Sequence, residues 1–217
     1  MRGLLRGAIA GLSLLTFACS AQEGAAKYES GKQYKPVREA QKPADPKRIE
    51  VAEFFWYGCP HCYAFDPFVE KWAKTKPADV DFVRYPSTLG RAEGQLHARA
   101  FYTAEALNVF PKMHPALFAA IHDKHQPLNN EAQIAAVFNR ETGVLPDVFT
   151  AAFKGFAVDS RARRAEQLAV SYGLTSVPIV VVGGKYATSA ALAGGYDQAL
   201  AVVNFLVDKV RKERGGK

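Results

Sequence analysis

The stretch VAEFFWYGCPHC, residues Val51–Cys62, decides the fold of this 217-residue chain. Its first part, Val51–Tyr57, is a largely apolar run of the kind that forms a buried strand. The residues after the second cysteine, Tyr63–Lys74, have the pattern of a helix. Two cysteines separated by two residues, at the junction of a strand and a helix, indicate a redox-active pair.

Cys59 is expected to be the N-terminal cap of that helix. Pro60 suits the first helical position, because its ring presets φ and its missing N–H would have no partner there. The residue before a proline is held in extended geometry, as a cap is. The sulfur would then face the free N–H groups of the first turn, which stabilise a thiolate. His61 adds a donor beside it, and Cys62, one turn on, would be the more buried, resolving sulfur.

A stabilised Cys59 thiolate has a definite consequence for the redox chemistry. It favours the reduced pair over the disulfide, so the disulfide becomes a stronger oxidant and Cys59 a better leaving group. Two other roles for the pair are disfavoured. A structural zinc site needs four ligands, usually from two such pairs, and the third cysteine, Cys19, lies in a leader segment. A structural disulfide across so small a ring would gain little from loop closure.

Residues 1–21 have the features of a secretory signal peptide. A basic start precedes the apolar stretch Gly7–Ala18, which is shorter than the ~20 residues that a membrane span needs, and small residues follow. We expect cleavage after Ala21. Cleavage before Cys19, with a lipid attached there, is disfavoured because the bulky Phe17 fits that signal poorly. Export would bring the chain to a compartment where disulfides form and persist.

The positive net charge of +7 does not indicate nucleic-acid binding. Basic residues are scattered, with small clusters at Arg161–Arg164 and Lys209–Arg214 on helix-like stretches, which is typical of solvated helix faces. The interleaved aromatic residues of single-strand binders are missing from both clusters.

The rest of the pattern predicts an α/β frame interrupted by helices. Within a polar N-terminal arm, Gln33–Val37 is a candidate edge strand. A strand, a helix and the alternating strand Val80–Tyr85 then form a βαβ unit, which should have a right-handed crossover. Helical spacing dominates afterwards until strand signals return at Ile179. The predicted bounds are the signal peptide at 1–21, the arm at 22–47, the α/β domain at 48–89 and 160–214, and a helical insert at 90–159.

Val177-Pro178 directly precedes the apolar strand Ile179–Val182, and Gly183-Gly184 after that strand predicts a hairpin turn. Proline cannot donate to a sheet, so it belongs at a strand start or an edge. The residues alone leave two readings open. One is an ordinary trans proline. The other is a cis bond beside the cysteine pair, which is the minority state for such bonds and would leave the Val177 backbone free to pair with an incoming chain.

Three segments together resemble the DsbA-type thiol:disulfide oxidoreductases of the Gram-negative periplasm, which belong to the thioredoxin superfamily. They are Val51–Cys62, Val177-Pro178 and the turn Gly183–Tyr186, and the resemblance covers nearly all of the chain after the leader. It implies an α/β thioredoxin fold with an inserted all-helical domain, and a periplasmic location. The family is a standard case of a depressed thiolate pKa and an oxidising disulfide, so the resemblance implies both.

The resemblance also implies roles for particular residues. Cys59 would be the exposed sulfur that substrates attack and Cys62 its buried partner. Pro60 and His61 would tune the redox potential, and Pro178 would be a cis-proline touching the active site.

Glu53 stands where the family carries a buried acid below the active site, which makes it a candidate proton acceptor for Cys62. The alternative is a strand carboxylate that faces solvent, since buried unpaired acids are rare. Where some members pair that acid with a lysine, the second strand here offers Arg84, whose permanent charge argues against a proton-relay role for that partner.

The expected activity is donation of the Cys59–Cys62 disulfide to reduced, newly exported proteins. Unfolded substrate chains would lie along Val177, in an apolar groove near Trp56 and Tyr57. The resemblance implies reoxidation by a membrane quinone reductase of the DsbB type. We expect a monomer that uses no cofactor besides its redox-active disulfide.

Two alternative functions are weighed against this one. A periplasmic disulfide isomerase would carry an N-terminal dimerisation domain, for which Glu23–Lys47 is too short and too polar, and His61 opposes the low potential that a reductase needs. A metal-binding protein would use His114, His122 and His125 of the helical segment, but their spacing is not a strong ligand pattern.

Overall fold

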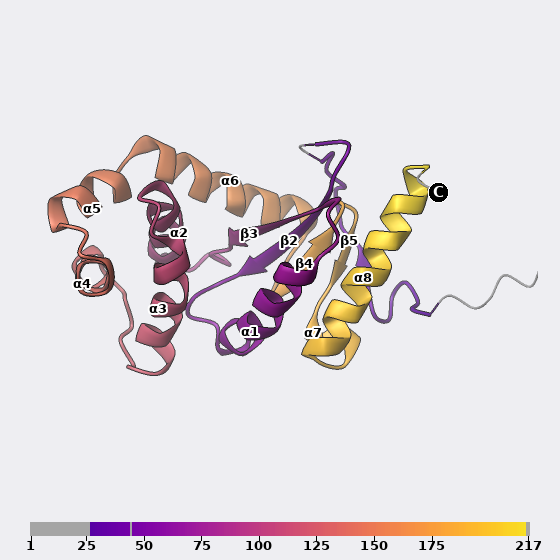
Figure 1. Cartoon of the computed structure of the whole chain (residues 1–217), viewed down its shortest axis with the longest axis horizontal. Coiled ribbons are helices and arrows are strands. Elements are labelled where there is room, and N and C mark those ends of the chain that lie inside the picture. Colours follow the sequence, from indigo (N-terminus) through magenta and orange to yellow (C-terminus); the bar gives the residue numbers. More distant parts are fainter. Residues whose placement is uncertain (1–26, 44, 216–217) are drawn as a thin grey trace, which may run out of the picture.

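The computed structural model describes residues 27–43 and 45–215. The expected signal peptide at 1–21 and the disfavoured lipid attachment at Cys19 lie outside these residues. Five strands form one mixed sheet in the order β1-β5-β4-β2-β3 (Figure 1). The strands are β1 (Lys35–Pro36), β2 (Ile49–Phe55), β3 (Val80–Pro86), β4 (Ile179–Val182) and β5 (Tyr186–Thr188).

Eight helices lie within the same part of the chain. They are α1 (Pro60–Thr75), α2 (Ala92–Ala106), α3 (Phe110–His122), α4 (Glu131–Thr142), α5 (Pro146–Phe153), α6 (Phe156–Tyr172), α7 (Ala190–Ala193) and α8 (Tyr196–Glu213). The predicted α/β thioredoxin fold with helices inserted between β3 and β4 is confirmed. The short helix α7 was not foreseen from the sequence.

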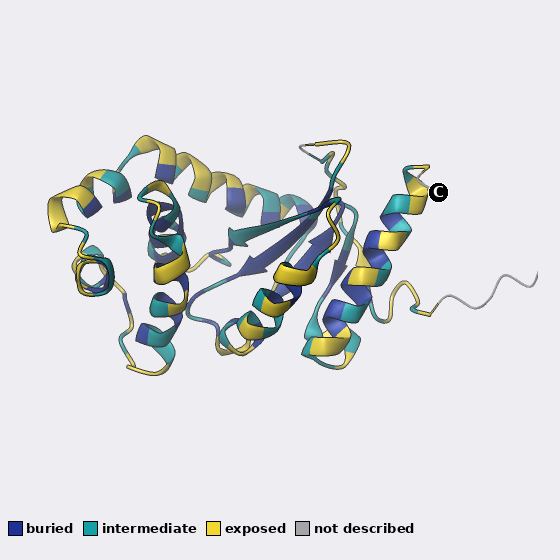
Figure 2. Ribbon diagram, viewed as in Figure 1, coloured by how far each residue is buried: buried dark blue, intermediate teal, exposed yellow. Residues whose placement is uncertain are grey.

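The central strand β2 has both faces buried, because its side chains alternate between two cores. Val51 points to the face covered by α1 and α8, while Phe54 points to the face covered by the C-terminal half of α6. The helices accordingly bury one side each and expose the other (Figure 2). This burial on both faces explains why the run Val51–Tyr57 carries apolar residues at successive positions rather than in strict alternation.

The predicted βαβ unit is present, with β2 and β3 parallel and α1 between them. On the other side β2 pairs antiparallel with β4, and the predicted edge strand at Gln33–Val37 is found in shortened form as β1. The predicted hairpin joins β4 to β5. Gly183 and Gly184 both have positive φ, and the turn is closed by the Lys185 N–H, which donates to the Val182 carbonyl at 3.1 Å.

The inserted helices share a core with the active-site segment. Phenylalanines of α2, α3, α4 and α5 form one apolar cluster, and this cluster extends to Phe55, Tyr57 and both cysteines of the motif. Helix α6 runs without a break through the expected boundary at 159/160, so the insert and the sheet share one helix. Movements of the helical part are therefore coupled by packing to the start of α1.

No helix in residues 27–43 and 45–215 combines the length and the apolar character that crossing a membrane requires.

Candidate redox-active site

The two cysteines lie at the start of α1, as predicted. Cys59 is the cap residue, with φ −91° and ψ 116°, and Pro60 opens the helix. The cap is fixed by its backbone, whose N–H donates to the Trp56 carbonyl at 3.0 Å and whose carbonyl accepts from the Tyr63 N–H at 3.1 Å. Its side chain makes no capping hydrogen bond within the described residues.

Both cysteines are free thiols in this structure. Cys59 is 8% exposed and Cys62 is fully buried at 0%. The resemblance implied an exposed Cys59, and this expectation needs correction. Cys59 is the more accessible of the two, but most of its surface is covered, because the segment around it packs into the core of the helical insert. A partner must approach its sulfur from one restricted direction.

The environment of Cys59 lowers the pKa of its thiol from 9.0 to about 6. The largest cause is the Cys62 thiol, which hydrogen-bonds to the Cys59 sulfur. Burial opposes the shift, while the backbone N–H groups of Cys62 and His61 and the charge of His61 add to it. Because the neighbouring dipoles favour the charged form, Cys59 is a thiolate at neutral pH.

The pKa of Cys62 moves the other way and is strongly raised. The causes are burial first, and then the hydrogen bond and negative charge of Cys59, with a contribution from the carboxylate of Glu53. One thiolate and one thiol therefore coexist in the reduced pair, and the thiolate is on the more accessible sulfur.

The Val177–Pro178 peptide bond is cis, which is the geometry that the resemblance implied. The loop that carries it lies against the cysteine pair, and the Cys59 thiol is 3.6 Å from the Val177 carbonyl oxygen, to which it donates when protonated. The structure thus brings the two distant sequence signals, Cys59–Cys62 and Val177-Pro178, into contact.

A groove of about 360 Å³ opens beside this contact, and its exposed lining is mainly apolar. It runs between the start of α1, the cis-proline loop, α7 and the start of α8, and it is lined by His61, Ser176, Val177, Pro178, Ser189, Ala190, Ala191, Gly195 and Tyr196. Of the expected substrate-contacting residues, Val177 lies on it. The part contributed by α7 could not be found from the sequence, because its four residues carry no helical periodicity long enough to detect.

The other two expected groove residues lie elsewhere. Tyr57 is 1% exposed and its hydroxyl is hydrogen-bonded inside the protein, so the expectation that it contacts substrate is wrong. Trp56 is half-buried, with the Arg91 guanidinium 5.1 Å from its ring centre and the ring of His97 stacked at 6.0 Å. These aromatic residues follow a buried strand and continue its packing into the helical insert, which sequence periodicity does not reveal.

Glu53 is buried, and the solvent-facing alternative is excluded. It is 2% exposed, and its Oε2 lies 3.0 Å from the Nε of Arg84, which is itself 8% exposed. Burial is the largest influence on its carboxyl group and outweighs the charge of Arg84, so the pKa of Glu53 is raised from 4.5 to about 7. The predicted pairing of this acid with Arg84 is therefore present.

Arg84 serves more than one carboxylate. Its guanidinium also contacts Asp66 Oδ1 at 3.2 Å and Glu70 Oε1 at 2.8 Å, both on α1. The sequence pattern did not predict this cluster, because the convergence of these acids on Arg84 depends on how α1 packs across β3. Three carboxylates around one guanidinium form a coupled, mostly buried charge network beneath the cysteine pair.

Of the three histidines considered as metal ligands, His125 is exposed in the segment after α3, and the other two are held by hydrogen bonds. His114 is buried and bonds Tyr57 and Asp66, while His122 donates to the Tyr57 backbone carbonyl at 2.8 Å and stacks on Tyr63. In the part of the chain that the structure describes, no group of three or more metal-ligating side chains is found.

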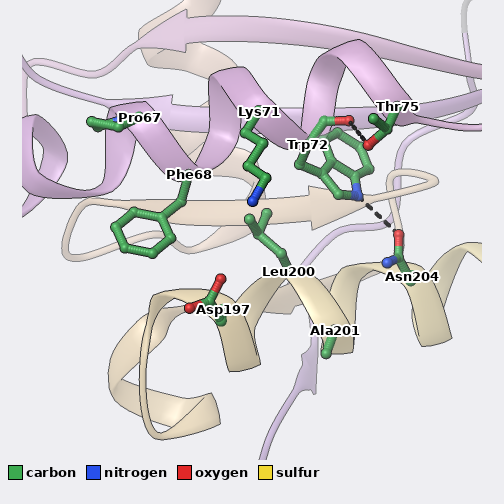
Figure 3. A pocket seen from close by; sticks show the side chains of 9 residues that line it. All are labelled: Pro67, Phe68, Lys71, Trp72, Thr75, Asp197, Leu200, Ala201 and Asn204. Carbon is green, nitrogen blue, oxygen red and sulfur yellow. Dashed lines mark hydrogen bonds between the residues drawn. The ribbon is translucent and has the colours of Figure 1, made fainter.

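A second groove, larger than the one beside the cis-proline loop, lies away from this chemistry. It has a volume of about 570 Å³ and lies between α1 and α8, where Trp72 donates to Asn204 at 2.8 Å (Figure 3). It holds no thiol among its lining residues, so size alone does not mark the functional site.

Comparison with known proteins agrees with this geometry. The family model described as "DSBA-like thioredoxin domain" matches residues 50–201. The chain is 39% identical over 213 residues to the thiol:disulfide interchange protein DsbA of Azotobacter vinelandii, covering 97% of this chain and 99% of that one. It is 37% identical over 211 residues to the protein of the same name from Pseudomonas aeruginosa, with coverage of 97% and 98%.

Solved structures give the same result in three dimensions. The crystal structure of Pseudomonas aeruginosa DsbA superimposes with a TM-score of 0.82 at 37% identity, covering 87% of this chain and 97% of that one. The oxidoreductase DsbA from Xylella fastidiosa gives a TM-score of 0.78 at 31% identity, with coverage of 85% and 98%. With the Cys-Pro-His-Cys motif at the start of α1, the cis-proline loop against it and the helices between β3 and β4, this chain belongs to the DsbA family of thioredoxin-fold proteins.

Proposed function

We propose that the oxidised form of this protein donates its Cys59–Cys62 disulfide to reduced proteins that have been newly exported to the periplasm. As a member of its family, the chain is an enzyme of thiol:disulfide exchange. The observation that carries the direction of exchange is the opposite displacement of the two cysteine pKa values. The pKa of Cys59 is lowered to about 6 and that of Cys62 is raised, so reduction yields a stabilised thiolate.

The reaction takes two exchange steps. A substrate thiolate attacks the Cys59 sulfur, the Cys59–Cys62 bond breaks, and Cys62 leaves and takes up a proton. A second substrate thiolate then attacks the substrate sulfur of the mixed disulfide, and Cys59 leaves as a thiolate. The substrate loses two electrons to the cysteine pair, which acts as the redox centre without a further cofactor. The low pKa of Cys59 makes it a good leaving group in the second step.

Glu53 is proposed as the group that exchanges the Cys62 proton. Its pKa of about 7 lets it give or take a proton at neutral pH, and its charge acts on Cys62. Arg84 cannot release a proton, so its part is to hold the carboxylate. Pro60 and His61 are proposed to tune the potential through the start of the helix and the charge beside Cys59.

The groove beside the cis-proline loop is proposed to hold the unfolded substrate chain, with its backbone along Val177. Its mainly apolar lining suits unfolded chains, which expose apolar side chains. Reoxidation of the reduced pair is assigned to a membrane quinone reductase of the DsbB type, and the working form to a monomer. Pro178 would contact the substrate next to the attacked sulfur.

The test is a redox titration against glutathione, together with the rate at which the oxidised protein oxidises a reduced, unfolded peptide with two cysteines. The expected potential is well above that of the glutathione couple, and oxidation should be stoichiometric in the enzyme disulfide. A Cys59→Ser variant should be inactive. A potential at or below that of glutathione would assign the chain to reduction or isomerisation instead.

A further inference from the structure

His114 ties the helical insert to the charge network beneath the cysteines. It lies on α3, is buried, and bonds on both sides of its ring. Its Nδ1 is 2.8 Å from the Tyr57 hydroxyl in the active-site segment, and its Nε2 is 3.0 Å from Asp66 Oδ1 on α1. The same Asp66 oxygen accepts from Arg84 at 3.2 Å.

The partners fix which nitrogen carries the proton. Asp66 shares the Arg84 guanidinium and acts as an acceptor, so the His114 Nε2–H donates to it and Nδ1 accepts from the Tyr57 hydroxyl. Burial lowers the pKa of His114, and the positive charge of Arg84 adds to this, although Asp66 and Glu70 oppose it. Both influences favour the neutral ring, whose Nε2–H donates to Asp66.

The aromatic surroundings of His114 reinforce that state. Its ring lies 4.9 to 5.4 Å, centre to centre, from four aromatic rings, which exclude water and leave Asp66 as the polar group on one side and the Tyr57 hydroxyl on the other. These rings belong to Phe55, Tyr57, Phe110 and Phe118. The insert thus presents one fixed N–H group to the carboxylates.

The His114 N–H matters because three carboxylates share one guanidinium, so hydrogen-bond acceptors outnumber donors around Arg84. Arg84 is shared among the carboxylates of Glu53, Asp66 and Glu70, and His114 supplies a further N–H to Asp66. A hydrogen bond to an ionised carboxylate favours the ionised form. Without it, Asp66 would depend on the Arg84 guanidinium alone, and because the charge of Asp66 raises the pKa of Glu53, less of the Arg84 charge would be left to hold that pKa down.

We propose that His114 is a positioning residue of the redox site, whose N–H compensates the Asp66 carboxylate, so that Arg84 stays with Glu53 and Glu53 can accept the proton of Cys62. This inference rests on the proposed role of Glu53. It makes the helical insert part of the proton chemistry, in addition to its part in shaping the fold.

The step that responds is ring closure during reoxidation. Glutathione disulfide first gives a mixed disulfide between glutathione and Cys59. Cys62 then passes its proton to Glu53 and its sulfur attacks Cys59, the Cys59–glutathione bond breaks, and glutathione thiolate leaves. At saturating glutathione disulfide this closure limits the rate, and stopped-flow tryptophan fluorescence follows it. The rate constant of the natural protein should inflect near pH 7, where Glu53 titrates.

The experiment compares His114→Leu with His114→Gln. The lost hydrogen bond is made to Asp66 and acts on Glu53 only through Arg84, so the inflection of the Leu variant should move up by about half a pH unit, less than a directly bonded group would show. Closure at pH 7 should then slow about twofold, as the ionised fraction of Glu53 falls. The Gln variant retains an N–H donor and an oxygen acceptor and should stay near the natural profile. If His114→Leu does not fold, His114→Met provides the same comparison, since its flexible chain fills irregular core space.

The matched control is His122→Leu, on the same helix. His122 also holds the active-site segment, but through the backbone carbonyl of Tyr57 at 2.8 Å. Its loss should leave the inflection in place. An unchanged inflection in His114→Leu, or a Gln variant shifted as far as Leu, overturns the inference. Glu53→Gln distinguishes failure of the His114 inference from failure of the proposed role of Glu53. If that variant keeps the natural inflection, the role of Glu53 itself is refuted.

Discussion

Glu53 and Arg84 are direct partners in the register of the parallel strands β2 and β3, and their buried side chains meet at 3.0 Å. The helix that joins these strands is α1, which begins at the cysteine pair. One βαβ unit therefore sets both the thiolate at the helix start and the charge pair beneath it. Because the carboxylate of Glu53 contributes to the raised pKa of Cys62, the ion pair belongs to the redox site as well as to the core.

Arg84→Met should destabilise the folded protein by about 3–5 kcal/mol at pH 8, because it leaves buried carboxylates without their counter-charge. Urea unfolding of the oxidised protein measures this. The matched control is Arg211→Met, which removes solvent-accessible ion pairs with Asp79 at 2.9 Å and with Asp208 and should cost less, about 1 kcal/mol. Equal losses in the two variants would mean that the Arg84 cluster is solvated.

Glu53→Gln should change how stability depends on pH. The folded-state pKa of Glu53, about 7, lies above its ordinary value of 4.5, so the folded state binds the extra proton between these values. Its contribution to the free energy of unfolding is fully present below about pH 4.5 and is lost as pH rises through 7. Stability of the natural protein should thus fall across this window relative to Glu53→Gln. Urea unfolding at pH 4.5 to 8 measures this. If the free energies of unfolding of the two proteins differ by a constant amount over that range, the raised pKa of Glu53 is contradicted.

Local sequence signals correctly predicted that the two cysteines lie at the start of a helix. Cys59 and Pro60 were predicted as cap and first helical residue, because proline geometry and helix capping depend on neighbouring residues alone. Gly183-Gly184 was likewise identified by the positive φ that such a turn requires. The pairing of Glu53 with Arg84 was implied by the family resemblance, in which some members pair the buried acid with a lysine, and the register of β2 and β3 places the two residues opposite each other.

Features that depend on distant packing were missed or wrongly assigned. Tyr57 follows an apolar strand and was expected in the substrate groove. Instead, the inserted helix α3 covers it, and its hydroxyl forms a hydrogen bond with His114. Asp66 showed no sign of belonging to a charge network, because its partners come from β3 and α3. Sequence periodicity identifies which side of a helix or strand is buried, but it does not identify the helix or strand that packs against that side.

The groove beside the cis-proline loop should be sensitive to charge. Ala191→Asp places a carboxylate at the exposed apolar lining next to Pro178, so it should raise the KM for a reduced unfolded peptide about tenfold, which corresponds to about 1.4 kcal/mol. The redox potential should not change. Ala201→Asp makes the same substitution in the groove between α1 and α8 and should leave KM unaltered. The reverse pattern would place substrate binding in that second groove.

The thiolate at Cys59 predicts that the reduced protein gains stability relative to the oxidised one as pH rises. The folded-state pKa of about 6 lies below the ordinary value of 9.0, so the folded reduced form binds fewer protons than the unfolded form between these values. The advantage of the reduced form should therefore be fully developed near pH 9 and disappear as pH falls through 6. Urea unfolding of both forms at pH 5, 7 and 9 measures it.

His61→Ala tests one cause of that advantage. The Cys62 thiol contributes most to the low pKa of Cys59, and the backbone N–H groups and the charge of His61 contribute less. The variant should raise the Cys59 pKa by about half a unit to one unit, seen as thiolate absorbance against pH, and lower the redox potential by about 15–30 mV. The same variant should shrink the stability difference between the two forms at pH 9, because potential and stability are linked through one thermodynamic cycle. A raised pKa with an unchanged potential would show that the thiolate does not set the oxidising strength, and the proposed direction of disulfide transfer would lose its physical basis.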